Sequence, residues 1–149
     1  MEDLDEQDRQ IIRLLASDGR MSFTDLAKAT TLSTSAAHQR VRRLEQRGVI
    51  KGYAAVVDLE SIGLPLTAFI SVSPIDPADP DDIADRLAPL AAVEGCYSVA
   101  GDQNYILKAR VASPGALESL LSEVRSTAHV TTRTTVVLSV PFENRPPHV

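Results

Sequence analysis

The sequence lacks three features that would each point to a special class of protein: paired cysteines, a long apolar run and an excess of positive charge. Its one cysteine, Cys96, cannot form an intrachain disulfide and cannot by itself make a zinc site. No apolar run approaches the ~20 residues that a membrane-spanning helix needs. The first residues are acidic, whereas secretory and transit peptides begin with basic ones. From these absences we expect a cytoplasmic protein.

The charge of the chain is unevenly distributed. A net charge of -5 argues against indiscriminate binding to nucleic acid, although it leaves room for a local basic patch. Residues 20–53 hold seven basic and two acidic side chains, a balance of +5, so the rest of the chain carries -10. A basic segment beside an acidic remainder suggests two modules with different partners.

The first thirty residues predict two helices. Asp5 can cap a helix that ends near Gly19, and its apolar side chains recur with a period of 3.6 residues. These side chains are Ile11, Ile12, Leu14 and Leu15. Ser22 and the acid three residues later resemble a capping box, which predicts a short second helix over residues 23–30.

A third helix follows after a short break. Ser33 can cap it, it runs to about Arg47, and Gly48 fits the left-handed position that often follows a helix. Its inward face, spaced i, i+4 and i+7, consists of Ala37, Val41 and Leu44. A short helix, a tight turn and a longer helix with a polar outer face describe a helix-turn-helix. In that motif the second of the two helices lies in the major groove of double-stranded DNA.

The polar residues of this third helix suit DNA recognition. Short hydroxyls and Gln can reach base edges, while Arg pairs with guanine or phosphate. The predicted DNA contacts are Ser33, Thr34, Ser35, His38, Gln39, Arg42, Arg43 and Arg47. Arg40 borders the buried face, where we expect it to pair with an acid such as Asp25 or Glu45. The alternative is a solvated helix face, but the preceding helix, the cap and the turn occur together and favour DNA binding.

The segment VIKGYAAVVD, residues 49–58, predicts an extended strand, which would make the module a winged helix-turn-helix. Gly63 and Pro65 then interrupt any regular element and indicate a hinge. We therefore expect a DNA-binding domain over residues 1–60, including this strand and hinge, and a second domain over residues 61–149.

The remaining two thirds predict the order β-α-β-β-α-β. The expected strands and helices cover residues 66–74, 81–93, 95–101, 104–111, 113–129 and 131–140. This order is that of the ferredoxin-like fold, an antiparallel sheet with helices on one face. The fold class is therefore α+β. The other face of the sheet needs cover, which commonly means a second subunit.

Four stretches carry a resemblance to a known family. They are LDEQDRQIIRLLASDGR, FTDLAKATTLSTSAAHQRVRRLEQRGVIKGYAAVVD, VEGCYSVAGDQNYIL and VTTRTTVVL. With them the chain resembles, over nearly its whole length, the Lrp/AsnC (feast/famine) transcriptional regulators of bacteria and archaea. The resemblance implies a homodimer formed through the ferredoxin-like module, which assembles into tetramers or octamers. It also implies an amino acid or related metabolite bound between dimers.

Carried over to this chain, the effector site of the family falls on the loop between the two central strands and on the last strand. The implied residues are Gly101, Asp102, Asn104, Tyr105, Thr132 and Thr134. Many relatives have an aspartate where this chain has Asn104, and only a carboxylate would attract the ammonium group of an amino acid by charge. Asp102 is the candidate to supply that charge instead. A simple turn, in which Gly, Asp and Asn are favoured for backbone reasons, is the alternative for this loop.

Three functions are therefore open. The first is a ligand-responsive transcriptional regulator, and the second is an architectural, nucleoid-associated DNA-binding protein that senses no ligand. The third is an enzyme, for which Cys96, His38 and His129 are the candidate residues by type. They show no nucleophile-and-base arrangement and no metal-ligand spacing. We expect no enzymatic activity, no metal and no cofactor.

Overall fold

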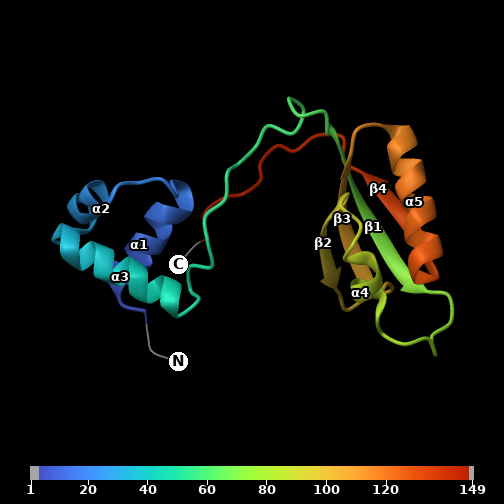
Figure 1. Ribbon diagram of the computed structural model, residues 1–149, viewed down its shortest axis with the longest axis horizontal. Coiled ribbons are helices and arrows are strands. Elements are labelled where there is room, and N and C mark those ends of the chain that lie inside the picture. The colour runs from blue at the N-terminus through green and yellow to red at the C-terminus, as the bar shows by residue number, and fades with distance from the viewer. Residues whose placement is uncertain (1–3, 148–149) are drawn as a thin grey trace. The chain divides into compact units, whose positions relative to one another are not determined.

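A computed structural model describes residues 4–147 and divides into two compact units (Figure 1). The first unit holds the residues up to Val56 together with those from Pro141 onward, and the second holds Val57–Val140. The predicted boundary after residue 60 thus lies four residues beyond Val56, and the predicted second domain also included the C-terminal segment. Within the first unit, Pro147 of that segment lines the same hollow as Ile12 and Leu15. The outer ends of both predicted domains, residues 1–3 and 148–149, lie outside the described residues.

Three helices form the first unit: α1 (Glu6–Ser17), α2 (Phe23–Thr30) and α3 (Thr34–Gln46). All three predicted N-caps are confirmed, since the side chains of Asp5, Ser22 and Ser33 each accept a backbone N–H three residues on. Gly48 follows α3 with a φ of 69°, the left-handed conformation that glycine adopts without strain.

One apolar cluster holds these helices together. It consists of Ile11, Leu26, Ala27, Ala37, Val41 and Leu44, each at most 4% exposed. The predicted inward face of α3 is therefore confirmed. Because complete burial of a leucine or isoleucine side chain stabilises a fold by about 1.5–3 kcal/mol, this cluster fixes the direction in which the other face of α3 points.

The predicted strand after the helix-turn-helix is not formed. Residues 51–58 have no regular secondary structure and pair with no strand anywhere in residues 4–147. A strand exists only where a neighbour receives its backbone hydrogen bonds. The helix-turn-helix is thus confirmed, whereas its wing strand is wrong for the described chain.

The second unit has the predicted βαββαβ order and therefore confirms the α+β fold. Its elements are β1 (Leu66–Pro74), α4 (Ile83–Leu87), β2 (Val93–Ser98), β3 (Tyr105–Val111), α5 (Pro114–Ala128) and β4 (Val130–Val136). The strands lie in the order β2-β3-β1-β4, and every neighbouring pair is antiparallel. Helix α4 is shorter than the predicted 81–93, because the chain turns at Pro89, which has no N–H to continue a helix.

The two faces of this sheet differ. Alternate residues of β1 and β3, such as Ile70 and Leu107, are buried against side chains of α4 and α5. The opposite face, which we call the open face, carries Phe69 and Tyr97, which are 39% and 53% exposed. Strand β4 follows the same alternation, since Arg133 pairs with Ser71 of β1 on the open face. An open face of this kind is where polar groups of neighbouring strands can gather.

Candidate nucleic-acid interface and effector hollow

The predicted DNA contacts lie together along α3 and its N-cap. Seven of the eight are exposed, and Arg47 is half-buried at the C-cap. The exposed ones are Ser33, Thr34, Ser35, His38, Gln39, Arg42 and Arg43. They share this exposure because the buried positions of α3 are three or four residues apart and leave the other side of the helix to solvent.

Several of these side chains already have local partners. The Ser33 hydroxyl accepts the N–H of Ala36 at 3.2 Å and lies 3.2 Å from the hydroxyl of Ser35. The ring of His38 meets Phe23 of α2 edge-on, with 4.7 Å between the ring centroids. The contacts of Ser33 stabilise the N-terminus of α3, and the ring contact packs α3 against α2.

Within residues 4–147, no hydrogen bond or ion pair engages the side chains of Thr34, Gln39 and Arg42. A hydroxyl, an amide and a guanidinium thus point to solvent from one helix face. These are the side-chain types that hydrogen-bond to base edges and phosphates.

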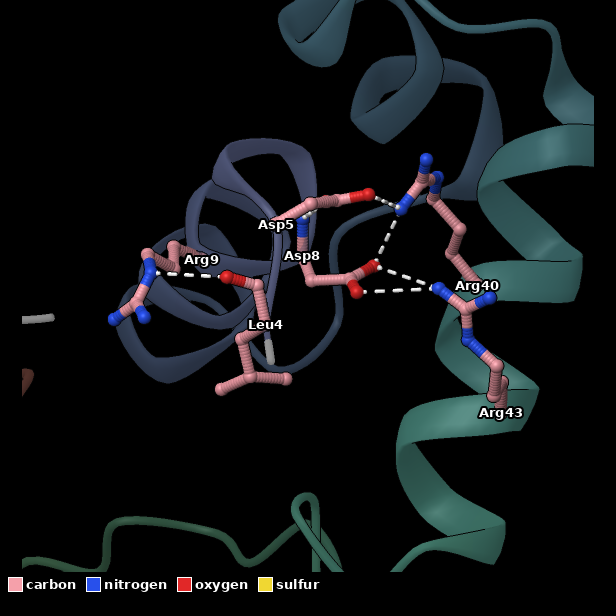
Figure 2. Close-up of polar contacts among 6 residues, drawn as sticks. All are labelled: Leu4, Asp5, Asp8, Arg9, Arg40 and Arg43. Atoms are coloured by element: carbon pink, nitrogen blue, oxygen red, sulfur yellow. Dashed lines mark hydrogen bonds and ion pairs between the residues drawn. The ribbon is translucent and has the colours of Figure 1, made fainter. Parts of the chain in front are cut away.

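Arg40 and Arg43 form an ionic cluster with Asp5 and Asp8, which we call the Asp8 cluster (Figure 2). Arg40 donates from Nη1 to both acids at 2.7 Å. Arg43 donates from Nη2 to Oδ2 of Asp8 at 3.1 Å and to Oδ1 at 3.4 Å. Arg9, by contrast, turns its Nε to the Leu4 carbonyl, away from the cluster (Figure 2). The start of α1 is thereby tied to the middle of α3.

The predicted pairing of Arg40 with Asp25 or Glu45 is therefore wrong. Glu45 lies five residues further along α3, where it faces another side of the helix and accepts the Tyr53 hydroxyl at 3.0 Å. The carboxylate of Asp25 accepts the Ser22 hydroxyl at 2.7 Å. The sequence signal that was missed is Asp8, an acid in the first turn of a helix at a position that faces the core.

The charges of the cluster stabilise one another. The backbone N–H of Asp8, followed by the Arg40 guanidinium, lowers the pKa of Asp5 below its ordinary value. The hydrogen bonds that Arg40 donates to Asp5 and then to Asp8 raise the pKa of Arg40. Asp5 and Arg40 are thus charged at neutral pH. Beside them a groove of about 330 Å³ is lined by Ala36, Gln39, Arg40 and Arg43.

A second candidate site lies on the open face of the sheet. A hollow of about 180 Å³ is lined by Ser71, Ser73, Asp102, Gln103, Thr131, Thr132 and Arg133. Of the predicted effector residues, only Asp102 and Thr132 line it. Thr132 pairs with Val72 and its hydroxyl accepts from Arg125 of α5, so its side chain belongs to the helix-covered face. Arg133 was missed, although the alternation of β4 places it on the face opposite the buried Val130. The hollow brings a carboxylate and a guanidinium to one small space.

The other predicted effector residues lie elsewhere. Tyr105 is 8% exposed in the core, and its hydroxyl donates to Oδ1 of Asp81 at 2.5 Å, a bond that raises the pKa of Tyr105. Thr134 pairs with Ile70 and so belongs to the helix-covered face. Gly101 and Asn104 belong to the turn before β3, where the Asn104 N–H donates to the Val72 carbonyl at 3.1 Å. These residues shape the sheet and the turn and do not line the hollow.

Other kinds of site find little support in the described residues. Among residues 4–147, no group of three His, Cys, Asp or Glu side chains is placed to hold a metal ion. His38 and His129 belong to different units, and partial burial raises the pKa of the Cys96 thiol. None of the described helices combines the length and the apolar character needed to cross a membrane.

Comparisons with known proteins match both units. The model of the AsnC-type helix-turn-helix domain matches residues 4–45, and that of the Lrp/AsnC ligand binding domain matches residues 67–147. The HTH-type transcriptional regulator LrpA of Mycobacterium tuberculosis is 49% identical over 144 residues, which cover 97% of this chain and 96% of the relative. The leucine-responsive regulatory protein of Escherichia coli K12 is 36% identical over 141 residues, with 91% and 85% covered.

Solved structures are similar over the same length. A feast or famine regulatory protein from Mycobacterium tuberculosis, complexed with L-methionine, superposes with a TM-score of 0.94 at 48% identity, and covers 97% of this chain and 100% of its own. A transcriptional regulator from Neisseria meningitidis, in complex with L-Met, gives a TM-score of 0.90 at 27% identity, with 98% and 97% covered.

Proposed function

The chain belongs to the Lrp/AsnC family of transcriptional regulators, and from this premise we propose that α3 enters the major groove of double-stranded DNA and that the second unit senses an amino acid. As a member of this family the chain is a DNA-binding regulator of transcription with a ligand-binding domain, and it is not an enzyme. A regulator works where the DNA is, so a cytoplasmic location is part of the proposal.

The observation that carries the DNA contact is the outward face of α3. Thr34, Gln39 and Arg42 are exposed and have no partner within residues 4–147, while the opposite face is locked into the core by Val41 and Leu44. Side chains of this kind reach base edges and phosphates from a recognition helix. Ser33, Ser35, His38, Arg43 and Arg47 flank them and extend the proposed contact.

A salt titration of Arg42→Ala tests this contact. The DNA is the upstream region of the gene itself, because members of the family often regulate their own genes. We expect weaker binding and, if Arg42 neutralises a phosphate, a salt slope smaller by about one unit for each bound protomer. Arg125→Ala, which removes the same charge from α5 of the second unit, is the control. Unchanged affinity and slope in Arg42→Ala would remove Arg42 from the interface.

The effector proposal rests on the two opposite charges of the hollow. An amino acid carries an ammonium and a carboxylate, for which Asp102 and Arg133 are complementary partners. The two relatives that bind L-methionine support this class of ligand. Asp102 would also supply the negative charge that Asn104 cannot.

A thermal-shift screen of the twenty amino acids tests the effector. A ligand that binds the folded state raises the apparent melting temperature, and Asp102→Asn should reduce the rise. A flat response at millimolar ligand would favour the alternative, an architectural DNA-binding protein that senses no ligand.

We also propose that the chain forms homodimers that assemble further into tetramers or octamers. The open face carries Phe69 and Tyr97 as exposed aromatic side chains, and no element of residues 4–147 buries them. A second copy would remove such apolar surface from water. Sedimentation at several protein concentrations measures this, and a monomer throughout would contradict it.

A further inference from the structure

Asp8 is the only acidic side chain buried in the described part of the chain, with a side-chain exposure of 2%. An ionised carboxylate removed from water is costly unless charged groups and hydrogen bonds compensate it. Here the compensation comes from α3: Arg40 bonds one oxygen of Asp8 at 2.7 Å, and Arg43 bonds the other at 3.1 Å (Figure 2).

The two arginines are held to different degrees. Arg40 has a side-chain exposure of 23% and divides one nitrogen between Asp5 and Asp8. Arg43 has a side-chain exposure of 52% and bonds only Asp8 through Nη2. A guanidinium has five N–H donors, so Arg43 keeps donors for a second acceptor. It also lines the groove beside α3 together with Gln39, one of the proposed DNA contacts.

We propose that Asp8 is a positioning residue that competes with a DNA phosphate for Arg43. By holding Arg43 at the edge of α3, Asp8 neutralises positive charge that would otherwise attract DNA of any sequence. Arg43 then binds a DNA phosphate only when α3 lies fully in the major groove. Asp8 therefore lowers affinity for arbitrary DNA more than affinity for the specific site. The inference rests on the proposed contact of α3 with DNA.

The charge balance of the cluster supports this competition. Two carboxylates and two guanidiniums cancel, so the pair of arginines contributes little net charge to DNA that approaches from a distance. Non-specific binding depends almost wholly on such charge and on the counterions released from the phosphates. Removal of the Asp8 charge should therefore act first on non-specific binding.

The test is Asp8→Asn in the full chain, with salt titrations on the gene's upstream DNA and on a scrambled duplex of the same length. Asn keeps the shape of the side chain and loses its charge. We expect the slope on scrambled DNA to steepen by about one unit for each bound protomer, and the ratio of specific to non-specific affinity to fall by about tenfold. A purely structural role would weaken both complexes and leave the scrambled slope unchanged, which would overturn the proposal.

Glu6→Gln is the matched control. Glu6 belongs to the same helix, has a side-chain exposure of 77%, and pairs with Arg13 at 2.7 Å, so the variant removes the same charge and one ion pair without touching α3. Its scrambled-DNA slope should stay close to that of the unmodified chain. A slope that steepens as much as in Asp8→Asn would attribute the effect to overall charge and overturn the proposal.

Arg43→Gln keeps the proposal testable should Asp8→Asn fail to fold. For Arg43→Gln we expect the salt slope of binding to the upstream DNA to fall by about one unit for each bound protomer. The salt slope on scrambled DNA should stay unchanged, because Asp8 holds Arg43 there. Equal falls on both duplexes, or none on either, would overturn the proposal. When Asp8→Asn and Arg43→Gln are combined, the steeper salt slope that Asp8→Asn alone gives on scrambled DNA should disappear.

The Arg42→Ala experiment separates the proposed contact of α3 with DNA from the proposed role of Asp8. If Arg42→Ala leaves DNA binding unchanged, the proposed contact through α3 fails. If Arg42→Ala weakens binding while the slopes of Asp8→Asn and Arg43→Gln do not move as expected, only the role of Asp8 fails.

Discussion

In the first unit, one helix carries nearly all the proposed contacts, whereas in the second unit the hollow draws on β1, the turn before β3, and β4. On α3 the buried face, with Val41 and Leu44, fixes by periodicity which side chains face outward. Asp102 and Arg133 line the same hollow only because the strands pair in one particular register. A site on one helix is thus local, while a site on a sheet depends on the whole fold.

The strongest way to separate the two units is to remove residues 1–60. We expect DNA binding to be abolished while the remaining residues still oligomerise, because the sheet and its helices have a core of their own. Gel-shift assays and sedimentation measure the two properties, with circular dichroism to confirm the fold. A folded remainder that is monomeric would contradict the assembly assigned to the second unit.

The two faces of α3 can be separated by one substitution each. Leu44 is fully buried, so Leu44→Ala should lower the free energy of unfolding of the first unit by about 2–5 kcal/mol. Thr34 is exposed, and Thr34→Ala should leave stability nearly unchanged while weakening specific DNA binding. Denaturant unfolding and DNA titration measure both. A loss of stability in Thr34→Ala comparable to that in Leu44→Ala would refute this division.

In the second unit the alternation of β4 predicts opposite results for two neighbouring residues. Arg133→Ala should abolish most of the amino-acid thermal shift, whose free-energy equivalent is about 2.7 kcal/mol at a ligand concentration 100 times Kd. Thr134→Ala should retain it, because Thr134 faces the helices. A response lost in Thr134→Ala and kept in Arg133→Ala would place the effector on the other face of the sheet.

The smallest expected effect concerns pH and Asp5. Its pKa is lowered in the folded state from an ordinary value of 3.8, so its contribution to stability is present above about pH 3.8 and is lost as the pH falls through the folded pKa. Asn is an equally good N-cap, so Asp5→Asn isolates the charge. The difference in unfolding free energy between the two proteins should shrink on acidification. A difference independent of pH would contradict this.

The sequence allowed most of the fold to be predicted because its signals are local. The caps Asp5, Ser22 and Ser33 and the inward face of α3 depend on residues within one or two turns. The wing strand could not be judged in the same way, since its residues favour a strand but have no strand partner in residues 4–147. Propensity alone cannot supply the neighbour that a strand requires.

The sites show the same limit. The exposed side chains of α3 were predicted from its periodicity, but Arg40 was paired with the wrong acid because its true partners lie 32 and 35 residues away in the chain. Tyr105, which the resemblance assigns to the effector site, is buried in the core, and its hydroxyl donates to Asp81, 24 residues away. Contacts of this kind follow from tertiary packing, so a local sequence pattern does not identify both partners.

The grouping of the C-terminal segment with the first unit has a consequence for protein engineering. Because residues from Pro141 onward belong with those before Val57, the second unit is inserted into the sequence of the first. A chimaera that exchanges ligand-binding domains between regulators of this kind therefore needs two junctions, near residues 57 and 140. A single crossover would leave the helix-turn-helix joined to the tail of another protein.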